Sequence, residues 1–223
     1  YPMKRNLSLI VPVAIALLAG CGGSSHNDLT PALPTVPKAT KLVYTDPTPA
    51  AGDWKLVKDA TATGTHLVLN LVGPTDGSKY RGVGFTLQLD PTLVKIAKFT
   101  DGKGKSLGYY LDGGIFLDKN LDDGNKDMAP SLQAGGVSNG KLMVGIFQKT
   151  DEEAWNAVKG ATAKDCNAVV LQVAIDFDAN LKAPVGAAPL TVVKARAIPE
   201  HVGTISNRKL NDISLKVGTL ALQ

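Results

Sequence analysis

An acidic segment near the middle of the chain holds the side chains best suited to bind a metal ion. Its oxygen-bearing residues are Asp118, Asn120, Asp122, Asp123, Asn125 and Asp127. Such a density of carboxylates and amides suits Ca²⁺, which takes many hard oxygen ligands. An EF-hand is not expected, because Gly124 falls one place late and Ala129 cannot supply the closing carboxylate. The segment predicts a looser calcium loop, with a solvated turn as the alternative.

Four aromatic side chains are candidates to stack on a sugar ring, as β-sandwich lectin-like modules do: Trp54, Tyr109, Tyr110 and Trp155. With aromatics at 5% of the chain, the alternative is that the core needs most of them. If Gly108–Leu111 is a strand, the two tyrosines point to opposite faces, and one of them faces outward.

Other reactive residues do not combine into a catalytic pattern. The three histidines, His26, His66 and His201, lack the spacing of a metal site. Cys166 stands between Asp165 and Asn167 without a neighbouring basic cluster, which indicates a structural thiol. The chain is therefore predicted not to be an enzyme. A paired-carboxylate glycosidase stays open as an alternative, since its two acids need not be close in sequence.

The amino-terminal residues have the order of a secretory signal peptide. Met3-Lys4-Arg5 precede an apolar run from Leu7 to Leu18, which is short for a membrane span, and small residues follow. Leu18-Ala19-Gly20-Cys21 resembles the lipobox of bacterial lipoproteins, which implies removal of residues 1–20 and acylation of Cys21. The alternative is an ordinary secretory leader with a chance cysteine. Because Gly22 follows the cysteine, the resemblance implies an outer-membrane lipoprotein facing the periplasm or the cell surface.

Charge and composition limit the functions and the domain organisation expected for the rest of the chain. Without Lys4 and Arg5, 22 basic residues face 20 acidic ones, and no cluster of bases and aromatics predicts nucleic-acid binding. Residues 21–41 are rich in Gly, Ser, Pro, Thr and Ala and predict a flexible linker. Residues 42–223 predict one folded domain, with no internal disulfide if Cys21 is acylated.

Alternating apolar residues predict a domain made of strands. The clearest cases are Val83–Asp90 and Val169–Phe177, the second followed by the turn-forming Asp178-Ala179-Asn180. Shorter apolar runs of strand length occur at Leu42–Tyr44, Trp54–Val57, Leu67–Val72, Val94–Phe99, Gly114–Leu117, Leu142–Phe147, Leu190–Ala197 and Ile213–Leu222. About nine strands predict an all-β sandwich with Greek-key or jelly-roll connections.

One segment predicts a short helix instead. Thr150-Asp151-Glu152-Glu153 forms a capping box, apolar residues follow at helical spacing, and Gly160 can end the helix. Trp155 on this helix either packs against the sandwich or stands exposed for a ligand.

Two strands and the turn between them resemble a known family. Gly82–Pro91 followed by Leu93-Val94-Lys95-Ile96 is similar to the cohesin and carbohydrate-binding superfamily, and Gly140–Ile146 and Leu171–Phe177 fit the same strand order. The resemblance covers roughly residues 42–222. It implies a nine-stranded jelly roll that binds a protein or polysaccharide and performs no chemistry.

Two functions follow as expectations. The first is a membrane-anchored envelope lipoprotein whose β-sandwich binds a protein partner or supports an assembly. The alternative is a calcium-assisted carbohydrate-binding module that uses Asp118–Asp127 and Tyr109, Tyr110 or Trp155. Calcium is the one cofactor that the sequence suggests.

Overall fold

The computed structural model describes residues 36–116, 131–148, 163–200 and 210–223, the first four of the second range by their backbone alone. Val36–Gln223 forms one compact unit. Its described elements are strands apart from one 3-10 helix, η2 (Ala179–Leu181), so the predicted all-β class is confirmed. None of the described helical residues forms a span long and apolar enough to cross a membrane.

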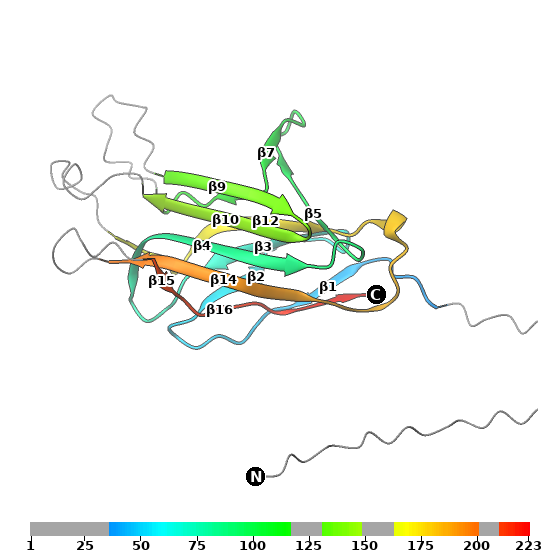
Figure 1. Ribbon diagram of the computed structural model, residues 1–223, viewed down its shortest axis with the longest axis horizontal. Coiled ribbons are helices and arrows are strands. Elements are labelled where there is room, and N and C mark those ends of the chain that lie inside the picture. Colours follow the sequence, from blue (N-terminus) through cyan, green and yellow to red (C-terminus); the bar gives the residue numbers. More distant parts are fainter. Residues whose placement is uncertain (1–35, 117–130, 149–162, 201–209) are drawn as a thin grey trace, which may run out of the picture. The chain divides into compact units, whose positions relative to one another are not determined.

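The first of two six-stranded sheets, called the β4 sheet, has the strand order β15-β14-β4-β10-β9, and β11 also pairs with β4 (Figure 1). All its neighbouring strands are antiparallel. Its strands are β4 (Lys79–Leu89), β9 (Ser131–Ser138), β10 (Lys141–Gln148), β11 (Lys164–Asp165), β14 (Leu190–Pro199) and β15 (Asn211–Asp212).

The second sheet, called the β3 sheet, has the order β16-β2-β3-β12-β5, and β8 also pairs with β12. Only β16 and β2 run parallel among its described pairs. Its strands are β2 (Trp54–Lys58), β3 (His66–Val72), β5 (Lys95–Ile96), β8 (Tyr110–Asp112), β12 (Val169–Asp176) and β16 (Leu215–Lys216).

Two smaller sheets complete the described strands. The first and last strands, β1 (Leu42–Thr45) and β17 (Thr219–Leu222), pair with each other, and β13 (Gly186–Ala188) pairs with β17. A hairpin of β6 (Phe99–Thr100) and β7 (Ser106–Gly108) lies between β5 and β8 in the chain.

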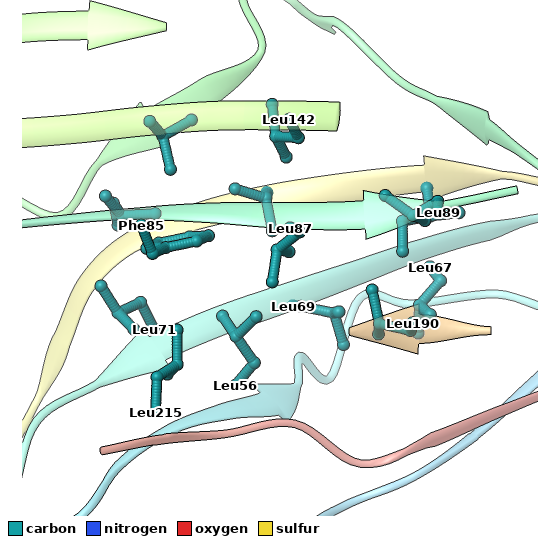
Figure 2. Packing of buried hydrophobic residues seen from close by; sticks show 14 of the residues in the cluster. Leu56, Leu67, Leu69, Leu71, Phe85, Leu87, Leu89, Leu142, Leu190 and Leu215 are labelled. Carbon is teal, nitrogen blue, oxygen red and sulfur yellow. The ribbon is translucent and has the colours of Figure 1, made fainter. Parts of the chain in front are cut away.

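The core fills the space between the β4 and β3 sheets. Figure 2 shows Leu87 and Leu142 of the β4 sheet pointing toward Leu69 and Leu56 of the β3 sheet, and all four are fully buried. Each strand contributes alternate residues to this layer, because successive side chains of a strand point to opposite faces. The strict alternation of β4 therefore predicted its buried face correctly.

Several predicted strands differ from those observed. Residues 114–116 form a bend and a turn, although Phe116 is fully buried, so the strand predicted at Gly114–Leu117 is wrong over its described part. The run Val94–Phe99 is divided between β5 and β6, and Ile213–Leu222 between β16 and β17. Strand β9 was not expected. The core is thus lined by more and shorter strands than the nine predicted.

Three further predictions are placed as follows. The helix predicted to begin at Thr150 lies outside the described residues. The turn after the 169–177 strand is present as η2, where the Asp178 side chain accepts a hydrogen bond from the Asn180 backbone N–H. Lys38–Lys41, in the predicted linker, belong to the compact unit: Ala39 N–H donates to Ala183 O (3.0 Å) and Thr40 N–H to Gln223 O (2.6 Å).

Candidate functional site

Most of the predicted site residues lie outside the described residues: Cys21, the acidic loop Asp118, Asn120, Asp122, Asp123 and Asp127, and Trp155. Within residues 36–116, 131–148, 163–200 and 210–223, no group of three or more His, Cys, Asp or Glu side chains could hold a metal ion. Both the calcium loop and the lipidated cysteine remain predictions.

Tyr109 and Tyr110 are described, and both are half-buried and pack against the core. The continuous strand that would send them to opposite faces does not form, because Gly108 has φ +101° and Tyr109 lies in a bend between β7 and β8. The ammonium of Lys98 lies 5.1 Å from the centre of the Tyr109 ring. Burial, followed by the charge of Asp112, raises the pKa of Tyr110. Neither tyrosine is a fully outward platform.

Trp54 and Cys166 both belong to the core. Trp54 is fully buried, so it cannot stack on a ligand at the surface. Cys166 is also fully buried, and burial raises the pKa of its thiol to about 12, with a smaller contribution from the charge of Asp165. A thiol in that state is not a nucleophile at neutral pH, in agreement with its predicted structural role.

A polar cluster lies on the outer face of the β3 sheet. The carboxylate of Asp59 accepts hydrogen bonds from Thr61 Oγ1 (2.6 Å), Asn70 Nδ2 (2.7 Å) and Gln172 Nε2 (3.2 Å). These bonds, those of Thr61 first, hold the pKa of Asp59 below its usual value. Gln172 Nε2 also donates to Asn70 Oδ1 (2.7 Å). Because these groups satisfy one another, the cluster is built to hold strands together.

A serine in the β9–β10 hairpin has the spacing of a hydrolase nucleophile, which the sequence-based prediction of no catalytic pattern overlooked. Gly136-Val137-Ser138-Asn139-Gly140 fits G-x-S-x-G, but that motif works at a strand–turn–helix elbow. Here Asn139 (φ 48°) and Gly140 (φ 73°) form the turn, and the chain continues into strand β10. Two successive positive φ values are those of a type I′ hairpin turn. Ser138 is therefore a hairpin residue.

An apolar hollow lies on the outer face of the β4 sheet, and we call it the outer groove. Its volume is about 510 Å³. Its floor is made of glycines, because Gly84 of β4 stands opposite Gly145 of β10 in the register of the sheet. With no side chain on either residue, the face is hollowed where two neighbouring strands would otherwise carry side chains.

The ring of Phe147 lies over this glycine floor. A Cβ atom built on Gly145 would come 2.8 Å from Phe147 Cε2, and one built on Gly84 would come 3.2 Å from Phe147 Cζ. A Cβ atom built on Gly82, the register partner of Phe147, would come closer still to the Phe147 ring. The glycines therefore let an aromatic ring lie flat on the sheet, which makes an apolar wall of the groove.

Two exposed apolar side chains extend this surface. Met143 stands opposite Thr86 and is 47% exposed, and Leu210 is 45% exposed; both line the outer groove. Contiguous patches of exposed apolar side chains are typical of surfaces that contact another molecule.

Basic residues of β14 form one rim of the groove. Lys194 and Arg196 line it, and none of its described lining residues is acidic. Arg196 Nε lies 2.8 Å from Asp212 Oδ1 in β15, and this hydrogen bond, with the charges of Arg196 and Lys194, lowers the pKa of Asp212. The groove is thus apolar on its floor and basic along one side, where Asp212 balances part of the charge.

Sequence patterns held a signal for this groove that the predictions did not use. In Leu142–Phe147 the residues of both faces are apolar or glycine, although only Leu142, Val144 and Ile146 point into the core. The other face, with Met143, Gly145 and Phe147, is apolar without being buried between the sheets. A strand that is apolar on both faces in a two-layer sandwich indicates an exposed contact surface.

Comparison with known proteins yields fold likenesses only. No family model matches the chain, and no curated protein does. Among solved structures, a cohesin module from a family 33 glycoside hydrolase of Clostridium perfringens aligns with 79% of this chain and 91% of its own, at 8% identity and a TM-score of 0.40. The second type II cohesin module of a scaffoldin from Acetivibrio cellulolyticus aligns with 81% of this chain and 94% of its own, at 10% identity and a TM-score of 0.44.

A third similar structure is a type I cohesin–dockerin complex from Clostridium thermocellum, which aligns with 74% of this chain and 88% of its own, at 11% identity and a TM-score of 0.44. The predicted fold class, an all-β cohesin-like sandwich, agrees with these likenesses. With TM-scores below 0.5, they identify neither a partner nor a binding face for this chain.

Proposed function

We propose that this protein is a non-enzymatic binding module that recognises a protein partner through the outer groove of the β4 sheet. The observation that carries the proposal is the exposed apolar surface formed by Met143, Phe147 and Leu210 around a floor of glycines. Burying such side chains against a partner is favourable by roughly 25 cal/mol per Å² of apolar area.

The lining favours a protein over a glycan. Sugar recognition needs several polar side chains that hydrogen-bond to hydroxyl groups. Among the described lining residues, which are mostly glycine and apolar, the polar side chains are Thr86, Lys194 and Arg196. Pockets that receive one or two apolar side chains of a partner are typical of the centre of protein interfaces. The calcium-assisted glycan module remains a prediction that rests on residues 118–127.

The basic residues on the rim of the groove also favour a partner of a particular charge. Lys194 and Arg196 of β14 are the charged residues among the described lining, and Arg196 already pairs with Asp212. A complementary partner therefore carries carboxylates beside the apolar side chains that fill the groove. These rim charges set the rate and specificity of association more than its affinity.

Site-specific photo-crosslinking tests the groove. With a photoreactive amino acid in place of Met143, we expect an adduct with one partner protein, identified by mass spectrometry. The control is the same residue in place of Leu107, which is also half exposed (50%) but lies in β7, outside the groove. An equal pattern of adducts at both positions would contradict a specific site.

The identified partner then allows a quantitative prediction. Met143→Glu should weaken its binding by about tenfold or more, because the new carboxylate must be desolvated beside acidic groups of the partner. Leu107→Glu, with the same change of charge, should leave the affinity unchanged. Calorimetry with the purified pair measures both, and equal losses in the two variants would remove the groove from the proposal.

We also propose that Cys21 tethers this module to the outer membrane. The support is the sequence alone: the charged, apolar and small-residue order of residues 3–20 and the Leu18–Cys21 lipobox. Acyl chains contribute roughly 0.8 kcal/mol per buried CH₂ group, so a protein with more than one chain is held firmly.

Metabolic labelling with a radioactive fatty acid tests the tether. The chain should incorporate label and sediment with membranes, and Cys21→Ser should abolish both properties. Cys166→Ser is the matched control, because it removes the chain's second and last cysteine and should keep the label. Label that survives Cys21→Ser would show that the cysteine is not the acceptor.

A further inference from the structure

Strand β9 forms one edge of the β4 sheet and is unlike the other described edge strands. It is eight residues long and pairs, among the described strands, only with β10 (Figure 1). No other described terminal strand of a sheet exceeds four residues. Leu190–Lys194 of β14 also lack a described strand partner on the side away from β4, but Lys194 and a register shift interrupt that stretch. At the opposite edge of the same sheet, β15 has two residues, one of which is Asp212 in an ion pair with Arg196.

The composition of β9 leaves this edge unprotected. Its sequence, Ser131-Leu-Gln-Ala-Gly-Gly-Val-Ser138, has no charged residue and no proline. Proteins commonly guard an exposed edge with lysine, proline, a bulge or a very short strand. The register of β9 with β10 runs without a shift from Ser131↔Gln148 to Ser138↔Lys141. A long, regular and neutral edge is a template for another strand, since alternate residues direct their N–H and C=O groups outward.

We propose that β9 pairs with β9 of a second copy of this chain, antiparallel and about a two-fold axis, so that two β4 sheets join into one continuous sheet. In such an isologous contact, each outward donor of one copy meets an acceptor of the other. A neutral edge is complementary to itself, because no like charges meet.

The distribution of charge on the sheet favours this occupant. The basic rim residues Lys194 and Arg196 lie on β14, three strands from β9, which is about 14 Å at the usual strand spacing. Pairing through β9 keeps the rims of the two copies at opposite margins of the joined sheet, whereas association through the other edge brings them together. It also leaves both outer grooves accessible on the same face.

Gly136 offers a variant on the edge strand, although it also lines the outer groove opposite Met143. A Cβ atom built on Gly136 has no heavy atom within 4 Å, so a longer side chain fits there without disturbing the fold. Gly136→Lys places a charge on the edge strand, where two symmetry-related lysines would come close together. Gly102→Lys is the matched control, because Gly102 has the same open surroundings but lies in the turn between β6 and β7.

Sedimentation velocity of the compact unit Val36–Gln223, which contains all the described strands and the whole core, tests the proposal. We expect a concentration-dependent dimer, weakened about tenfold or more by Gly136→Lys and unchanged by Gly102→Lys. Hydrogen exchange of the β9 amides should slow as protein concentration rises.

Met143→Ser separates edge pairing from packing of the two outer faces. Met143 lines the outer groove on β10 but is not on the edge, so edge pairing should survive its loss. A monomer at every accessible concentration, a dimer untouched by Gly136→Lys, or a dimer abolished by Met143→Ser would each overturn the proposal.

Discussion

Replacing Trp54 with alanine should lower the free energy of unfolding by about 3–5 kcal/mol, the usual cost of removing a large aromatic side chain from a core. Trp54 begins β2 in one sheet and is fully buried. Its ring meets Tyr80 of β4 in the other sheet edge to face, with 5.0 Å between ring centres and an interplanar angle of 69°. The variant therefore loses a contact between the two layers as well as buried area. Urea unfolding followed by circular dichroism measures the change.

Trp54→Phe is the informative companion. The indole Nε1 is buried and has no hydrogen-bond partner within the part of the chain that the structure describes. Such a donor is costly, so an aromatic ring without it keeps the packing and removes a penalty. Trp54→Phe should lose well under half of the free energy lost by Trp54→Ala. Equal losses in both variants would contradict this and would mean that the part of the indole that phenylalanine lacks stabilises the fold.

Gly113→Ala should cost about 1–3 kcal/mol or more, because the added methyl group meets backbone that cannot move freely. A Cβ atom there would approach the carbonyl oxygen of Val170 to 2.8 Å and that of Val169 more closely still. Gly113 N–H also donates to Val170 O (2.8 Å), which holds the end of β8 against β12 next to the register shift between Val169 and Leu171. Relief of the clash requires this hydrogen bond to lengthen.

Gly102→Ala is the control for this glycine. A Cβ atom on Gly102 has nothing within 4 Å, and its backbone is outside the left-handed region. The free energy of unfolding of the Gly102→Ala variant should change by no more than about 0.5 kcal/mol. Thermal unfolding of the two variants side by side compares a glycine required by close approach with one that is not. A similar loss in both would show that the contact with β12 is not what makes Gly113 necessary.

The strands with the clearest sequence signal are two that alternate in side-chain type. In β4 and β12, large apolar residues alternate with small or polar ones, and the alternation follows the two-layer packing directly. The strand predicted at Gly114–Leu117 is wrong over its described part. Ile115 and Phe116 are apolar because they pack in or against the core from a turn, and not because they belong to a strand. Strand β9 was missed because Gly135-Gly136 interrupts any apolar period, and its pairing with β10 is set by the Asn139-Gly140 turn.

The outer groove depends on relations that one strand does not display. Gly84 and Gly145 are about sixty positions apart in sequence and become a single floor only through the register of β4 and β10. The basic rim comes from a third strand, β14. Composition of each strand was therefore accessible from the sequence, whereas the hollow arises from the pairing of distant segments. The expectation that one tyrosine faces outward required a continuous strand, which the positive φ of Gly108 breaks.

The pairing of β1 with β17 also determines how the compact unit responds to mechanical force. Leu42 stands opposite Leu222, and Thr40 and Lys41 N–H groups donate to Gln223 O, so the chain enters and leaves at the same end of one antiparallel pair. Tension between these two points acts across the backbone hydrogen bonds and loads them one after another, because the pair can open from its end like a zipper. Force applied in this way peels β1 from β17 before it reaches the two sheets, which leaves the outer groove intact while the ends give way.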